Sequence, residues 1–112
     1  MFGLGKKVFV VQIEGRTMWQ AVRDLRDGHW FAVCRPLNLS AAGDTWGELE
    51  EGMKEAVALL FESLVERGEL EAFLQRNNWR IGSPTPPPGA RLRVEIPTEI
   101  EIRERVAELA LA

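Results

Sequence analysis

Gly43-Asp44-Thr45-Trp46-Gly47-Glu48 begins the longest helix that the sequence predicts. The Thr45 hydroxyl can accept a hydrogen bond from the Glu48 backbone N–H. The Glu48 side chain can in turn reach back to the Thr45 N–H, which is the capping-box pattern. We therefore expect a helix over residues 45–67, followed by Gly68 in the left-handed position that commonly ends a helix.

Apolar residues recur along this segment at spacings of three and four, so they share one helical face. They are Trp46, Leu49, Met53, Ala56, Val57, Leu60 and Leu64. The opposite face is mostly charged, and Arg67 in the last turn complements the helix dipole. We expect the apolar face to be core rather than a cofactor site, and to pack on the strands that precede it.

Extended segments precede the helix. Residues 8–13 are rich in β-branched and aromatic side chains, which favours a strand. Polar and apolar residues alternate imperfectly over 17–26, which predicts a second strand with one solvent-exposed face. Asp27-Gly28 is a strong hairpin signal, and residues 29–34 are apolar on both faces, which predicts a central strand. Residues 37–42 are expected to connect this strand to the helix.

The segments after the helix define the expected domain layout. Apolar spacing predicts a short second helix over residues 69–76. The Pro-rich segment 82–89 reads as a stiff spacer, with a polyproline ligand as the weaker alternative. We therefore expect an α+β domain over 1–81, a linker over 82–89, and a strand and tail over 90–112 that pack on the same domain.

The C-terminal segment carries conflicting signals. Leu92, Val94 and Ile96 alternate with charged residues, which predicts a half-buried strand. Beyond Pro97, Thr98 with Glu101 could cap another helix, whereas continued alternation favours a strand. We favour a strand to about residue 102, followed by a frayed tail.

Composition limits the classes of function. The 112 residues fit one domain, with a net charge of -3 and one cysteine. This acidic balance makes nucleic-acid binding by this chain alone unexpected, because such proteins are usually basic. It favours a basic partner instead. The lone Cys34 suits a reducing cytoplasm, and no apolar run reaches the length of a membrane span.

Side chains for catalysis or metal binding are sparse. His29 is the only histidine, so the chain offers no zinc ligand set of the usual spacing. Cys34 is expected to be buried and inert. Glu14, Asp24 and Asp27 lie in or beside predicted turns, where carboxylates are usually solvated. We therefore expect no enzyme, no cofactor and no metal.

Residues 18–79 resemble the HicB-like antitoxin domain of bacterial toxin–antitoxin pairs. The resemblance rests on the order of Asp27-Gly28, Trp30-Phe31-Ala32, Pro36, Gly43-Asp44-Thr45, Glu48 and Glu55-Ala56. It implies a partial RNase H-like β-β-β-α-β core, in which the helix packs on a small antiparallel sheet. It also implies binding to a small basic toxin that cleaves RNA. The chain departs from the family in its extra segment 8–13, and residues 91–112 are too short for a helix-turn-helix.

The expected fold class is thus α+β: a small antiparallel sheet, one long helix and a short second helix, in the order β-β-β-α-α-β. The expected function is an antitoxin-like protein-binding module. The expected partner-binding residues are carboxylates on the charged helix face: Glu48, Glu51, Glu55 and Glu62. The alternative is a homo-oligomeric assembly domain with no toxin partner, and we expect at least a dimer because sheet edges must be covered.

Overall fold

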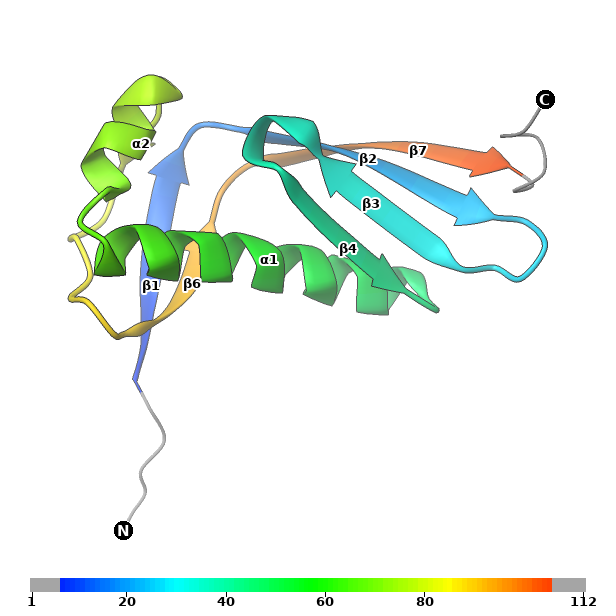
Figure 1. The fold of residues 1–112 in the computed structure, drawn as a ribbon, viewed down its shortest axis with the longest axis horizontal. Helices are drawn as coiled ribbons and strands as arrows, with labels where there is room; N and C mark the ends of the chain where they lie inside the picture. Colours follow the sequence, from blue (N-terminus) through cyan, green and yellow to red (C-terminus); the bar gives the residue numbers. More distant parts are fainter. Residues whose placement is uncertain (1–6, 106–112) are drawn as a thin grey trace, which may run out of the picture. The chain divides into compact units, whose positions relative to one another are not determined.

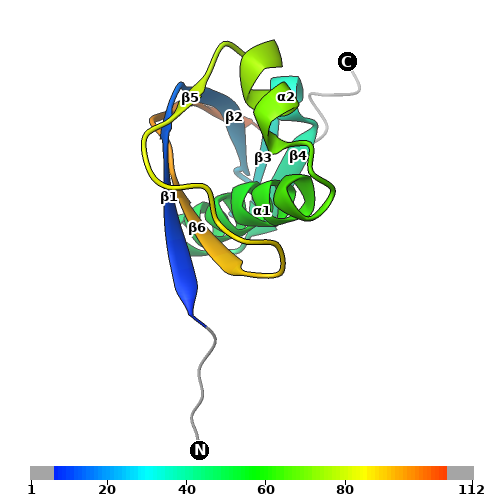
Figure 2. The same ribbon diagram turned by 90° about the vertical axis from the view of Figure 1, so that its left-hand side faces the viewer.

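The computed structural model describes residues 7–105, which form two α-helices, one 3-10 helix and seven strands (Figures 1 and 2). The elements are β1 (Val8–Glu14), β2 (Thr17–Asp24), β3 (Trp30–Cys34), η1 (Arg35–Leu37), β4 (Leu39–Gly43), α1 (Trp46–Glu66), α2 (Leu70–Arg76), β5 (Arg80–Ile81), β6 (Arg91–Glu95) and β7 (Thr98–Arg105). None of the helices in this part of the chain is long and apolar enough to cross a membrane.

The chain divides into two compact units that interleave along the sequence. Of the described residues, the first unit contains 7–16 and Val57–Pro97, and the second contains Thr17–Ala56 and 98–105. Each unit holds one β-sheet. Helix α1 contributes to both, because the division falls between Ala56 and Val57.

The sheet of the second unit has the strand order β4-β3-β2-β7. β2, β3 and β4 are antiparallel neighbours, whereas β7 runs parallel to β2, with Thr17 opposite Thr98. The buried side of this sheet carries Trp19 and Ala21 from β2 and Ala32 from β3, each at most 2% exposed.

The sheet of the first unit has the order β5-β1-β6. β6 runs parallel to β1, with Val8 opposite Arg91, and the short β5 pairs antiparallel with the end of β1. The α+β class is confirmed. The expectation of one antiparallel sheet is wrong, because residues 7–105 form two sheets and each contains a parallel pair. Alternation along a strand reveals which residues share a face, but it carries no information on strand direction.

Aromatic rings fill the core of the first unit. Phe61 of α1 is fully buried and meets Phe73 of α2 edge to face, with 5.9 Å between ring centroids. Phe73 meets Trp79 in the same manner at 5.7 Å. Trp79 therefore docks on the core after α2 ends.

The caps of α1 follow the expected pattern with one difference. The Glu48 N–H donates to the Thr45 hydroxyl at 3.1 Å, but the Glu48 carboxylate accepts from the Asp44 N–H at 2.8 Å rather than from Thr45. At the other end Gly68 has φ +70°, and the Glu69 N–H reaches the Leu64 carbonyl at 2.8 Å. This bond belongs to a Schellman motif, which only a left-handed residue at position 68 allows.

The buried face of α1 gains Phe61, whereas three residues expected on it, Trp46, Ala56 and Leu60, are only half-buried. Leu49, Met53, Val57, Phe61 and Leu64 are buried. Leu60, which was expected in the core, is only half-buried, and the last turn holds no basic residue because the helix ends at Glu66. Spacing alone leaves positions 60 and 61 equivalent, and the Phe73 ring opposite Phe61 decides between them.

Residues 37–42 contain a strand instead of a simple connection. Asn38 adopts φ +56° after η1, and β4 then pairs with β3 from Leu39 to Gly43. Ser, Ala and Gly have weak strand propensity, so the strand is determined by its pairing with β3 rather than by its own residues. Gly43 permits the close turn into α1, because a Cβ there would lie 2.7 Å from the Leu49 nitrogen.

The Pro-rich segment lies against β1. The Gly82 N–H donates to the Gln12 carbonyl at 2.7 Å, the Ser83 hydroxyl accepts from the Gln12 N–H at 3.0 Å, and Pro86 is buried. After β6, the strand interpretation of the C-terminal segment is confirmed over Thr98–Arg105. β7 thus extends beyond the end predicted near residue 102, and the rest of the predicted frayed tail, 106–112, lies outside the described residues.

Candidate functional site

One side of the β4-β3-β2-β7 sheet is left uncovered within its unit, and we call it the outer face. Residues on alternate positions of the four strands form it. They are Met18, Gln20 and Val22 of β2, Phe31 and Val33 of β3, Ser40 and Ala42 of β4, and Glu99, Glu101 and Arg103 of β7.

The outer face carries exposed apolar side chains on β2 and β3. Met18 is 56% exposed, Phe31 52% and Val33 37%. Their neighbours along the same strands point to the other side, where Trp19 and Cys34 are at most 2% exposed. Contiguous exposed apolar side chains of this kind commonly mark a binding surface.

Strand register brings these side chains into rows across the sheet. Phe31 lies between Val22 on β2 and Ala42 on β4. Val33 lies in the next row, opposite Gln20 on one side. The apolar surface is therefore continuous over three strands, and the charged residues of β7 border it.

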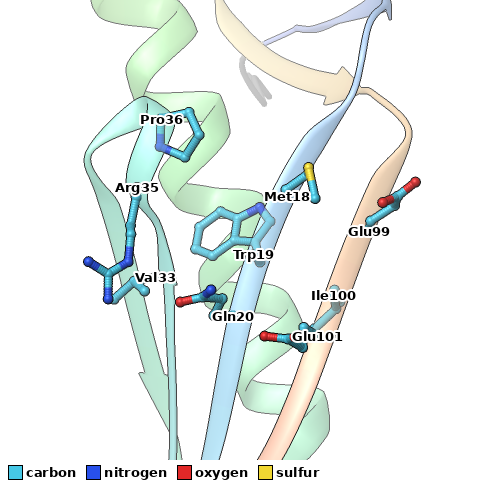
Figure 3. Close-up of a pocket in the computed structure, with 9 residues that line it drawn as sticks. All are labelled: Met18, Trp19, Gln20, Val33, Arg35, Pro36, Glu99, Ile100 and Glu101. Carbon is cyan, nitrogen blue, oxygen red and sulfur yellow. The ribbon is translucent and has the colours of Figure 1, made fainter.

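A shallow hollow of about 560 Å³ lies where β3 ends and η1 begins (Figure 3). It is lined by Met18, Trp19, Gln20, Val33, Arg35, Pro36, Glu99, Ile100 and Glu101. Gln20 and Glu101 are register partners, and Figure 3 shows Arg35 across the hollow from Glu101, beside Val33. The hollow can hold an apolar side chain between a cation and a carboxylate.

The hairpin end of this sheet carries a second group of polar and aromatic side chains. His29 Nδ1 lies 2.7 Å from a carboxylate oxygen of Asp44, and the His29 ring meets Phe31 edge to face. Trp30 meets Trp46 at the start of α1, with 5.0 Å between ring centroids. His29 thus ties the β2–β3 turn to the entry of the helix.

The turn carboxylates have local structural partners. Asp24 accepts a hydrogen bond from the Arg26 N–H at 2.9 Å, and Asp27 accepts one from the His29 N–H at 2.8 Å. Over residues 7–105 no three His, Cys, Asp or Glu side chains come close enough to hold a metal ion. Cys34 is buried, as expected.

The four predicted partner-binding carboxylates differ in their surroundings. Glu51 and Glu55 are exposed, and Glu51 lies 3.5 Å from Lys54. Glu48 is part of the helix cap. Glu62 belongs to the other unit, is half-buried and accepts the Leu92 N–H at 2.9 Å.

Sequence reasoning missed the outer face. The signal is present in residues 29–34, which are apolar on both faces, but this pattern by itself predicts only a central strand. β3 is indeed internal to its sheet, yet its Phe31 and Val33 are exposed. An internal strand guarantees neighbours within the sheet but not a second covering layer.

No protein-family model, no curated protein and no solved structure matches the chain.

Proposed function

We propose that the chain is a protein-binding module of the antitoxin type, whose outer face binds a small basic toxin that cleaves RNA. The observation that carries the proposal is the group of exposed apolar side chains, Met18, Phe31 and Val33, on the outer face of a folded sheet. The HicB-like resemblance of residues 18–79 supplies the class of partner.

The sheet order supports the proposal. The resemblance implies three antiparallel strands, a helix and a final strand. In the second unit β2, β3 and β4 precede α1, and β7 joins the sheet beside β2.

Charge explains the choice of a basic partner. The chain has a net charge of -3, and Glu99 and Glu101 border the hollow on the outer face. Complementary charge accelerates association and selects the partner, while buried apolar contacts hold the complex. The outer face offers both, whereas Glu51 and Glu55 on α1 offer charge alone.

The test is co-purification with the small basic product of an adjacent reading frame, followed by rescue of growth when that product is expressed. We expect Phe31→Thr to abolish both. Leu59→Gln is the matched control, because Leu59 is 56% exposed on α1 in the other unit. The double variant Glu51→Lys, Glu55→Lys tests whether the partner binds the charged face of α1 rather than the outer face of the sheet.

Loss of binding in the helix variant alone would move the site to α1. Binding that survives in Phe31→Thr would exclude the outer face. No complex and no rescue with the wild-type chain would refute the antitoxin-type function.

A second candidate function is a homo-oligomeric assembly domain. The observation that favours it is the edge strand β7, an eight-residue strand that pairs only with β2 among the described residues. Strands of this length with an open edge readily accept another chain.

A further inference from the structure

We infer that β7 is a self-recognition strand that pairs with β7 of a second copy in antiparallel fashion, with the two-fold axis beside Ile102. The inference deepens the assembly function and does not depend on a toxin partner. It rests on the charge order along the strand and on one exposed isoleucine.

The charge order of β7 is antisymmetric about Ile102. Glu101 precedes Ile102 and Arg103 follows it, and both are exposed on the outer face. In antiparallel pairing about a two-fold axis, residue 101 of one copy lies opposite residue 103 of the other, twice. Within one chain these two side chains form an ion pair at 3.4 Å. In the dimer each Glu101 also faces the Arg103 of the second copy, and opposite charges at directly opposed positions stabilise a strand pair.

Neighbouring registers lack this match. Residues that lie opposite each other in a strand pair point to the same side of the sheet, and side chains alternate between the two sides. The two-fold axis must therefore pass beside a residue and not between two residues. Centring on Glu101 or on Arg103 places two identical charges opposite each other. Centring on Ile100 places Glu99 opposite Glu101. The register centred on Ile102 is the one that the charges select.

Ile102 gives an independent reason on the other side of the sheet. Its register partner is Ala21, which is 0% exposed, yet Ile102 itself is 54% exposed. The buried side of this sheet thus has an exposed isoleucine at its edge, on β7. In the proposed register this side chain meets Ile102 of the second copy, which extends the apolar layer across the axis.

Charge reversal tests the pairing in solution. Wild-type protein is expected to sediment at micromolar concentration with twice the monomer mass of 12.6 kDa. Glu101→Arg and Arg103→Glu each create like-charge pairs, so each variant alone should dissociate about tenfold more readily. An equal mixture of the two variants restores both opposite-charge pairs and should restore the dimer.

The matched controls lie on β6, in the other unit. Arg93 and Glu95 are two residues apart on their strand, as Glu101 and Arg103 are on β7. They form an ion pair at 3.7 Å, and their side chains are exposed to a similar degree as those of Glu101 and Arg103. Arg93→Glu and Glu95→Arg should leave the dimer intact. Equal weakening by the β6 variants would overturn the assignment to β7.

Cysteine substitutions along β7 show which residues lie opposite each other in the dimer. They test the pairing even where a charge variant fails to fold. Directly opposed residues lie close enough for a disulfide. Ile102→Cys should therefore cross-link two chains under mild oxidation, whereas Ile100→Cys, which would face residue 104, should not. Cys34 is buried and should stay unreactive.

A wild-type monomer would overturn both the β7 pairing and the assembly function. A dimer that ignores the charge variants and does not cross-link through residue 102 would overturn the β7 pairing while leaving assembly standing through another surface.

Discussion

The two faces of the β4-β3-β2-β7 sheet have similar side chains but different surroundings. On β3, Ala32 and Cys34 are 1% exposed on one face, whereas Phe31 is 52% exposed on the other. All five residues of this strand are apolar. Apolar composition shows that a surface favours burial, but whether the same chain buries it depends on what the rest of the chain can cover. The outer face is therefore available to another molecule.

The largest effect should come from the covered face. Trp19→Ala removes a side chain that is 2% exposed and should lower the free energy of unfolding by about 3–5 kcal/mol, through lost burial and the cavity left behind. Urea denaturation measures this change. If Trp19→Ala lowered the free energy of unfolding no more than substitution of an exposed residue does, the contrast between the two faces would be contradicted.

Helix α1 offers the same contrast between neighbouring positions. Phe61→Ala removes a fully buried ring that packs on Phe73, and should cost about 3–4 kcal/mol. Leu60→Ala should cost less than half of this, because Leu60 is half-buried. Equal denaturation midpoints for the two variants would contradict the assignment of the buried face.

The helix cap should contribute less than either core residue. Thr45→Ala removes the acceptor for the Glu48 N–H and should cost about 1 kcal/mol. Thr45→Asn is the control that keeps a side-chain oxygen, and it should retain most of the stability. If Thr45→Ala proved as costly as Trp19→Ala, the cap would have to support more than the first turn of α1.

The smallest effect on stability should come from the outer face. Phe31→Thr keeps strand propensity and should change the free energy of unfolding by no more than about 0.5 kcal/mol, since Phe31 is half exposed. The same variant should abolish partner binding. Separate measurements of stability and binding thus distinguish a docking residue from a core residue, and a large loss of stability would class Phe31 with the core.

Short-range signals in the sequence were sufficient for the helices and their ends. Thr45, Glu48 and Gly68 act through bonds to residues within five positions, so a single sequence reveals them. The same holds for the Asp27-Gly28 hairpin, where the Gly28 N–H donates to the Asp24 carbonyl at 2.7 Å.

Features that depend on distant partners were not predictable in the same way. β4 exists because β3 pairs with it, and Glu62 is engaged because the Leu92 N–H lies beside it. The outer face was missed for the same reason. The helix carboxylates could be named from their spacing, but the exposure of Phe31 depends on which layers the whole chain supplies.

The two parallel ladders have a consequence for the order in which the chain can fold. Val8 lies opposite Arg91, 83 residues further along, and Thr17 lies opposite Thr98, 81 residues further along. The β2–β3–β4 meander closes from neighbouring segments, whereas both parallel ladders must close long loops, which slows folding. During synthesis the meander and α1 emerge while β1 and β2 still lack their parallel partners. A ribosome-bound chain stalled before residue 91 would thus present two open strand edges, and such edges are the sites at which nascent chains aggregate or recruit chaperones.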